Sequence, residues 1–348
     1  MIQEGSARIE IETPKIVSKK MEVFYNPVME LNRTISILLI KSYFKKPPRI
    51  ADIMAGSGVR AIRLLKEAKI NSIAINDYSE QAIKRIKKNL RLNEINENYT
   101  LHNKDANIFL LESKGFDYID VDPFGSPNPY LDAAIKRISR DGILAVTATD
   151  TAALTGTYEN ACKRKYWAVP LRNYMMHEIA VRILIRKVQL IGAQYEKALT
   201  PVISYSKDHY YRILLKCEKG KRKCDEIIKK HCFFNFCHEC GSFGLEECEC
   251  EFGRRKKGPI WTGTLNDTKI LGNMLKMSDE KTKKFLDILK EESKIGQVGF
   301  YSLNKMAKGN IPKIKELLEK LESNKIKAAR THFSHDGIKA SKEFSRFL

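Results

Sequence analysis

The chain of 348 residues is long enough for two or three folded domains, and its 43% hydrophobic and 30% charged residues argue against a disordered protein. Lys and Arg number 62 and Asp and Glu 42, a net charge of +20. This charge favours a polyanionic partner such as nucleic acid over a lysine-rich surface that reflects only genome composition or growth at high temperature.

No segment is apolar enough to span a bilayer, and the first residues do not form a secretory signal. We therefore expect a cytoplasmic protein that does not bind a membrane.

Strands and helices alternate through the first part of the chain. Apolar runs predict strands at 49–55, 70–76, 99–103, 116–122 and 142–149. Amphipathic spacing predicts helices at 59–68, 79–92 and 172–191. Strands that alternate with helices of this length imply a parallel, doubly wound sheet, which an antiparallel pair at 202–206 and 211–217 would complete. The fold class predicted for this part is therefore α/β and Rossmann-like.

The composition changes at about residue 219, where the chain becomes rich in Cys and Lys and then helical. We place a domain boundary there, with an α/β domain over 1–220 and a smaller α+β domain over 221–348. Near the C-terminus, 302–308 and 311–321 resemble a helix-turn-helix, and a β wing is predicted near 327–333. Such winged-helix-like modules bind nucleic acids, and they also serve as protein–protein platforms.

A glycine-rich turn follows the first strand. Gly56 and Gly58 let the backbone approach a ligand, and the helix N-terminus beyond them favours an anion, with which Arg60 could pair. Asp77, 19 residues after Gly58, stands where an acidic residue holds a ribose diol. The pattern fits both NAD and S-adenosylmethionine. A glycine turn that only packs a helix on a strand is the structural alternative.

The fourth strand ends in the tetrapeptide Asp122-Pro123-Phe124-Gly125, which decides between these cofactors. The Asp122 carboxylate can accept a hydrogen bond from an exocyclic amine, Phe124 can stack on a flat heterocycle, and Pro123 fixes the backbone between them. Hydride transfer has no use for such a group, whereas methylation of a base amine needs a carboxylate that takes the amine proton. We therefore predict S-adenosylmethionine as the cofactor and Asp122 as the catalytic carboxylate.

Further distinctive segments are Val23–Pro27, Leu31–Arg33, Asp105–Asn107, Val146–Asp150, Lys165–Arg172 and Thr331–Ser334. Together with the glycine loop and the segment from Asp122 to Pro127, they resemble the tRNA (guanine-26, N2)-dimethyltransferase family over nearly the whole chain. The resemblance implies a class I methyltransferase domain that transfers one or two methyl groups to the exocyclic N2 of guanine 26 of tRNA, giving N2-methyl- and N2,N2-dimethylguanosine. Because that guanine lies inside folded tRNA, it would have to be extruded into the pocket.

The same resemblance implies roles for individual residues. Asp122 would be the catalytic carboxylate, and Phe24 would form a second wall of the base pocket, opposite Phe124. The residues that would contact the cofactor are Arg33, Arg60, Asp77, Asp105 and Ala106. On the sequence alone, Asp105 either accepts the adenine amine or caps a helix.

A second candidate site is a set of closely spaced cysteines. Cys237 and Cys240 form a C-x₂-C pair, and Cys248 and Cys250 follow as C-x-C, which is enough thiolates for one tetrahedral Zn²⁺. Four thiolates leave no open coordination position, so we predict a structural zinc loop at 237–250 without a catalytic role. His231 or Cys232 could displace one ligand, and buried thiols are expected at Cys162, Cys217 and Cys224.

Basic runs at 221–223 and 254–257 flank the zinc loop. Beside a base-modifying pocket, we interpret them as phosphate contacts, so tRNA is the predicted partner and no obligate protein partner is evident. Two alternatives remain open at this stage: a methyltransferase acting on amines of DNA bases or on glutamine amides, and a winged-helix nucleic-acid binder with a degenerate cofactor fold.

Overall fold

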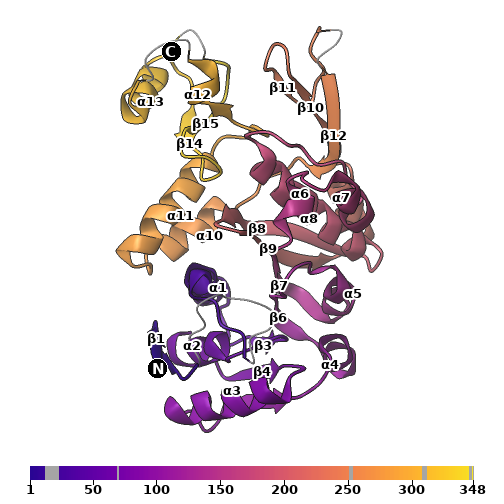
Figure 1. Ribbon diagram of the computed structural model, residues 1–348, viewed down its shortest axis with the longest axis vertical. Helices are drawn as coiled ribbons and strands as arrows, with labels where there is room; N and C mark the ends of the chain where they lie inside the picture. Colours follow the sequence, from indigo (N-terminus) through magenta and orange to yellow (C-terminus); the bar gives the residue numbers. More distant parts are fainter. Residues whose placement is uncertain (12–22, 69, 251–253, 308–311, 345–346, 348) are drawn as a thin grey trace. The chain divides into compact units, whose positions relative to one another are not determined.

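The computed structural model of the protein describes residues 1–11, 23–68, 70–250, 254–307, 312–344 and 347 (Figure 1). These residues fall into two units. Unit 1 comprises Met1–Thr149, Ile191–Thr200 and Leu214–Lys223, and unit 2 comprises Asp150–Leu190, Pro201–Ile213 and Cys224–Leu348. The boundary near residue 220 stays a prediction, because this division does not establish which parts fold independently.

The main sheet has seven strands in the order β5-β4-β3-β6-β7-β9-β8. Its strands are β3 (Arg49–Asp52), β4 (Ser72–Asn76), β5 (Tyr99–His102), β6 (Phe116–Val121), β7 (Ile138–Ala148), β8 (Lys197–Lys207) and β9 (Tyr210–Lys219). Neighbours from β5 to β7 pair in parallel. Only two residues separate β8 from β9, so these adjacent strands form an antiparallel hairpin. The predicted parallel sheet with an antiparallel end is confirmed.

Helices connect the parallel strands of unit 1, as the alternating pattern predicts. They are α2 (Val59–Glu67), α3 (Glu80–Leu92), α4 (Ala106–Glu112) and α5 (Asn128–Arg137), while α1 (Glu30–Tyr43) precedes β3. Ser79 caps α3, because its side chain accepts a hydrogen bond from the amide of Ala82. Before α1 lie the hairpin of β1 (Ile2–Glu4) and β2 (Ala7–Ile9) and the 3₁₀ turn η1 (Pro27–Met29).

The sheet order places the ligand-binding edge. The chain runs outward from β3 through β4 to β5 on one side and from β6 to β7 on the other, so the order reverses between β3 and β6. Ligands of open α/β sheets bind beyond the carboxyl ends of the strands at such a reversal. The glycine loop follows β3 and Asp122 follows β6, so both predicted site segments begin at this edge.

Unit 2 contains a second group of helices and two small sheets. Its helices before the C-terminal part are α6 (Thr151–Leu154), α7 (Glu159–Tyr166), most of α8 (Met176–Ala193) and α9 (Lys221–Ile228), α10 (Thr268–Leu275) and α11 (Glu280–Glu292). One small sheet has the order β11-β10-β12, with antiparallel pairs between β10 (His231–Cys237), β11 (Phe243–Gly244) and β12 (Arg254–Trp261).

The C-terminal part has its own core. Two helices, α12 (Leu303–Met306) and α13 (Ile314–Ser323), accompany a three-stranded antiparallel sheet of β13 (Tyr301–Ser302), β15 (Gly337–Ala340) and β14 (Ala328–Arg330). Leu317, Leu321, Ile338 and Phe344 are buried together there. The predicted pair of helices and the β strands are present, although 308–311 lie outside the described residues. No helix in the described ranges is long and apolar enough to cross a membrane.

Candidate functional site

The turn after β3 is shaped by two glycines. Gly56 has φ +53° and Gly58 has φ +78°, a left-handed conformation that favours glycine. A Cβ atom at Gly56 would lie 2.8 Å from the carbonyl oxygen of Phe24, so the backbones of the two segments touch. The amide of Gly56 donates a hydrogen bond of 2.8 Å to Oδ2 of Asp77. The predicted loop and the predicted acidic residue are therefore held together.

Asp77 and Asp105 lie at the ends of neighbouring parallel strands, β4 and β5. Asp77 accepts a second bond, of 2.9 Å, from the amide of Ser79. Asp105 caps α4 by accepting hydrogen bonds from the amides of Asn107 and Ile108 through Oδ1. The structure thus realises the capping role of Asp105, and its other oxygen takes no part in these cap bonds.

A hollow of about 520 Å³ lies beside Asp105 and begins one residue after Asp77. Its lining residues are Tyr78, Ser79, Glu80, Gln81, Asn103, Lys104 and Asp105. Ala106 begins α4 and is buried beside this edge. The carboxylates, the closely approached glycine turn and the N-terminus of α2 offer acceptors for hydroxyl and amino groups and donors for an anion, which suits an amino-acid nucleoside such as S-adenosylmethionine.

Asp122 lies directly after β6 and pairs with Arg60 of α2. Its side chain is 19% exposed, whereas that of Arg60 is 5% exposed. The Arg60 guanidinium also lies 3.1 Å from Oδ2 of Asp120 and donates to Oδ1 of Asn32 at 3.1 Å. The buried guanidinium therefore orients a carboxylate whose outer side reaches solvent.

Two further carboxyl groups belong to this cluster, and we did not predict a role for either. Asp120 precedes Asp122 by two residues and accepts a hydrogen bond of 2.8 Å from the hydroxyl of Tyr118. Asp52, the register partner of Asp120 on β3, is 2% exposed. Burial raises the pKa of Asp52 to about 7, and the negative charges of Asp120, Asp122 and Asp77 act in the same direction, against Arg60. The sequence holds a signal for both groups, because Asp52 ends the apolar run of β3 and Asp120 stands near the end of that of β6.

The aromatic pair predicted for a base pocket is present. The rings of Phe24 and Phe124 lie with centroids 5.6 Å apart at 88°, an edge-to-face contact. Both remain partly exposed, at 38% and 49%. Pro123 is buried, and the amide of Gly125 donates a hydrogen bond of 2.6 Å to the hydroxyl of Thr149, directly after β7. Arg60 therefore holds this segment at Asp122, and Thr149 holds it at Gly125.

Arg33 lies in a separate buried network. Its guanidinium pairs with Glu4 of the N-terminal hairpin and donates a hydrogen bond of 3.0 Å to the carbonyl of Asn26. Glu4 is 3% exposed and also accepts bonds from Arg63 and from the hydroxyl of Tyr25. Arg33 thus fixes the segment next to Phe24, a connection that no local sequence pattern indicates.

Comparison with known proteins shows the family of the chain. A family model for the N2,N2-dimethylguanosine tRNA methyltransferases matches residues 5–348. The chain belongs to this family. The tRNA (guanine(26)-N(2)/guanine(27)-N(2))-dimethyltransferase of Aquifex aeolicus is 37% identical, over 100% of this chain and 94% of the relative. The tRNA (guanine(26)-N(2))-dimethyltransferase of Methanocaldococcus jannaschii is 36% identical, over 97% and 95%.

A solved structure extends this family likeness to the fold. Trm1 from Pyrococcus horikoshii, in complex with S-adenosyl-L-methionine, is 35% identical to this chain. The match covers 99% of this chain and 98% of the other, with a TM-score of 0.87. The predicted family and the Rossmann-like methyltransferase fold are confirmed.

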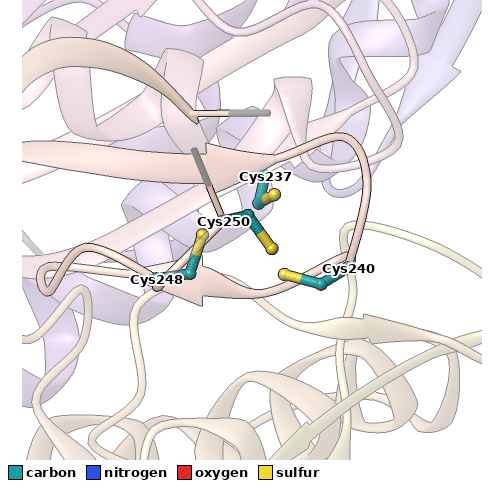
Figure 2. Close-up of side chains that lie close together, drawn as sticks. All are labelled: Cys237, Cys240, Cys248 and Cys250. Carbon is teal, nitrogen blue, oxygen red and sulfur yellow. The ribbon is translucent and has the colours of Figure 1, made fainter. Parts of the chain in front are cut away.

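This member of the N2,N2-dimethylguanosine tRNA methyltransferase family also brings its four predicted cysteines together (Figure 2). The sulfur atoms of Cys237, Cys240, Cys248 and Cys250 all lie within 4.8 Å of one another. A tetrahedral zinc with bonds of about 2.3 Å places thiolates roughly 3.8 Å apart, so the cluster has the size and donor set of a zinc site. As predicted, Cys162, Cys217 and Cys224 are buried and are not part of the cluster.

Proposed function

We propose that this chain transfers one or two methyl groups from S-adenosylmethionine to the exocyclic N2 of guanine 26 of tRNA. The products would be N2-methyl- and N2,N2-dimethylguanosine. The single observation that carries the proposal is the Asp122 carboxylate, held by Arg60 and flanked by Phe124 beside the glycine loop, in a chain of this family. We further propose that the protein acts in the cytoplasm, with tRNA as its partner and no obligate protein partner.

The cofactor site of the proposal is built from the edge described above. The turn at Gly56 and Gly58 and the N-terminus of α2 would receive the methionyl part, Asp77 the ribose, and Asp105 with Ala106 the adenine. Arg33 and Arg60 are also proposed as cofactor contacts, although their guanidinium groups pair with Glu4 and with Asp122 in this structure. S-adenosylmethionine would supply an electrophilic methyl group, whose bond to sulfur breaks as the new N–C bond forms, leaving S-adenosylhomocysteine.

Asp122 is the proposed proton acceptor. The lone pair of a guanine amine is delocalised into the ring, so the amine is a poor nucleophile. A carboxylate that accepts a hydrogen bond from N2–H localises this lone pair and takes the proton as the new N–C bond forms. Because the methylated, positively charged amine is very acidic, a carboxylate paired with Arg60 is a sufficient base. Such assistance contributes ~10²–10⁴-fold, and alignment of the reacting atoms up to ~7–11 kcal/mol.

Phe24 and Phe124 are the proposed walls of the base pocket. Their edge-to-face contact means that one ring has to turn and the two rings have to move apart for a purine to stack between them. Extrusion of the guanine costs a few kcal/mol, which stacking on these rings and the hydrogen bond to Asp122 would offset. The four cysteines are proposed to hold a structural Zn²⁺.

Nucleoside mass spectrometry tests the proposal. An unmodified tRNA transcript is incubated with the protein and S-adenosylmethionine, digested and analysed for methylated guanosines. We expect N2-methyl- followed by N2,N2-dimethylguanosine, and neither product in a transcript with adenine at position 26. Dimethylation that persists in this transcript would move the target to a neighbouring guanine. Methyl incorporation into DNA or protein, with none into tRNA, would overturn the proposal.

A further inference from the structure

Trp167, in unit 2, is a large aromatic side chain on the surface. It is 47% exposed, whereas Trp261, the other tryptophan of the chain, is 3% exposed. Trp167 follows the last turn of α7 in the left-handed conformation, with φ +55° and ψ +39°. This position of a helix end usually holds glycine, and a bulky residue there is an outlier. An exposed indole in an unfavourable backbone conformation calls for a reason other than packing.

Neighbouring bonds fix this conformation. The Trp167 amide donates to the carbonyl of Lys163 at 3.1 Å, and its carbonyl accepts 3.1 Å from Arg186 of α8. Two residues later, Val169 exchanges both backbone hydrogen bonds with Gly258 of β12, at 2.8 and 2.7 Å. The Trp167 backbone is therefore held between α7, α8 and β12.

One ring face of Trp167 is already in use. The ammonium group of Lys187, a residue only 5% exposed, lies 2.9 Å from a ring centroid of Trp167. This cation–π contact holds the ring from α8. Trp167 is nevertheless 47% exposed, so this contact leaves much of the residue accessible to a partner.

The surface around the ring is basic. The last turn of α7 carries Lys163, Arg164 and Lys165, all exposed. From β12, Lys257 lies 3.8 Å from Glu159 at the start of α7. Lys163 in the first place, and also Lys257 and Arg255, lower the pKa of Glu159, so cations of both elements surround one carboxylate. Asp150 also lies 3.5 Å from Lys165, and the cations of α7 and β12 still outnumber these two carboxylates.

We propose that Trp167 stacks on an unpaired base of the RNA substrate, while cations of α7 and β12 bind the flanking phosphates. The inference rests on the proposed function for the identity of the RNA. An aromatic face beside basic side chains is the arrangement with which proteins bind single-stranded nucleotides, because every base has a π face and every link a phosphate.

Intrinsic fluorescence gives a direct test, because the chain has only two tryptophans and one is buried. Titration of the full-length protein with unmodified tRNA transcript should quench its emission and protect it from acrylamide. Trp167→Phe leaves Trp261 as the only emitter, and the tRNA-induced quenching should disappear although binding persists. Quenching of the same size in Trp167→Phe, or none in the unchanged protein while it binds tRNA, would overturn the proposal.

Binding constants separate a stacking role from a structural one. Trp167→Ala should weaken tRNA binding by about 5- to 100-fold, the range found for loss of one base–aromatic stack, and Trp167→Phe by far less. Trp167→Gly should weaken tRNA binding as much as Trp167→Ala does. Its melting temperature should stay close to that of the unchanged protein, because glycine adopts the left-handed conformation without strain. Met277→Ala, at a residue of unit 2 that is 39% exposed between α10 and α11, is the matched control and should bind normally.

The outcomes also separate this inference from the proposed function. A protein that methylates tRNA but binds it equally well as Trp167→Ala refutes the stacking role alone. A protein whose Trp167 emission is quenched by tRNA, but which forms no methylated guanosine, refutes the proposed activity alone. A Trp167→Gly variant that melts far below the unchanged protein would identify Trp167 as a structural residue and overturn the inference.

Discussion

At the residue scale, Asp122 is the group on which the proposed chemistry depends. Asp122→Asn keeps the size of the side chain and can still accept a hydrogen bond, but it cannot take a proton. We expect single-turnover methyl transfer to tRNA to slow by about two orders of magnitude or more, because general-base assistance is lost. The affinity for S-adenosylmethionine should change little, which isothermal titration would check.

The same variant separates two explanations of the ion pair. If Arg60 mainly orients Asp122, then Asp122→Asn should slow the transfer without changing the affinity for tRNA. If Asp122 mainly neutralises Arg60, the variant should lower the melting temperature and the cofactor affinity together. A transfer rate within tenfold of the unchanged protein would remove Asp122 from the catalytic role.

Asp52 makes a prediction about stability and pH. Its carboxyl is buried, Oδ2 has no hydrogen-bond partner among the described residues, and its pKa is raised from 3.8 to about 7. The folded protein therefore keeps this proton at a pH at which the unfolded chain has lost it. The resulting stabilisation is complete below about pH 4 and is lost as the pH rises through 7, by at most about 4 kcal/mol.

Asp52→Asn should remove this pH dependence, because the amide cannot ionise. The variant should match the unchanged protein near pH 4 and exceed its free energy of unfolding near pH 8, as measured by urea titration across that range. Asp287→Asn, at an exposed position of α11, is the control and should keep the original profile. Parallel profiles for Asp52→Asn and the unchanged protein would show that Asp52 titrates normally.

At the element scale, the four-cysteine loop should bind one Zn²⁺ per chain. Cys240→Ser removes one of four ligands, so the zinc content and the thermal stability of the loop should both fall, as measured by elemental analysis and by hydrogen exchange of β10 and β11. Cys232→Ser changes a cysteine of β10 that lies outside the cluster, and it should keep the metal. Unchanged zinc in Cys240→Ser, or lost zinc in Cys232→Ser, would contradict the assigned ligand set.

Within unit 2, helix α8 is tied to the C-terminal sheet by a buried ion pair. Lys339 of β15 lies 2.8 Å from Glu178, and the side chains are 3% and 0% exposed. Burial would raise the pKa of Glu178, but the charges of Lys339 and Arg182 outweigh it and lower this pKa to about 2. The Glu178 carboxylate is therefore ionised in the core and depends on these partners.

Lys339→Met should destabilise unit 2 strongly, because it leaves a buried carboxylate with one cation fewer. Loss of a buried partner costs about 3–5 kcal/mol, whereas the same change in an exposed pair costs at most about 1 kcal/mol. Lys294→Met, in the exposed pair with Glu291, is the matched control. Denaturant titrations of the two variants should differ accordingly, and equal midpoints would show that the buried pair contributes no more than a surface pair.

The sequence predicts those features that depend on one strand and the turn after it. Asp122, Asp77 and the glycine loop could be placed because the carboxyl ends of parallel strands meet at one edge of a sheet. The Arg60–Asp122 pair could not, because it joins residues 62 positions apart whose contact depends on how α2 packs. Likewise, nothing local indicates that Glu4 holds Arg33, or that Trp167 is exposed instead of buried like Trp261.

At the scale of the whole molecule, the dominant feature is the net charge of +20. A protein with this excess of Lys and Arg attracts polyanions over long distances, and counterions are released from the nucleic acid on binding. The chemistry proposed for Asp122 concerns one base, but most of the affinity for tRNA should come from phosphates. Affinity and catalysis should therefore respond differently to ionic strength.

Salt titration tests this separation. Between 50 and 200 mM salt, the Kd for tRNA should rise steeply, by about 10³-fold or more if roughly six phosphates are bound. The Kd for S-adenosylmethionine should change by only a few-fold over the same range. This ligand has a single net charge, so salt has only a small electrostatic attraction to screen. The transfer rate at saturating tRNA should also stay nearly constant, since Asp122 acts within a formed complex. A tRNA affinity that does not change with salt would show that the positive charge serves another purpose, such as solubility, and would leave stacking and shape as the basis of recognition.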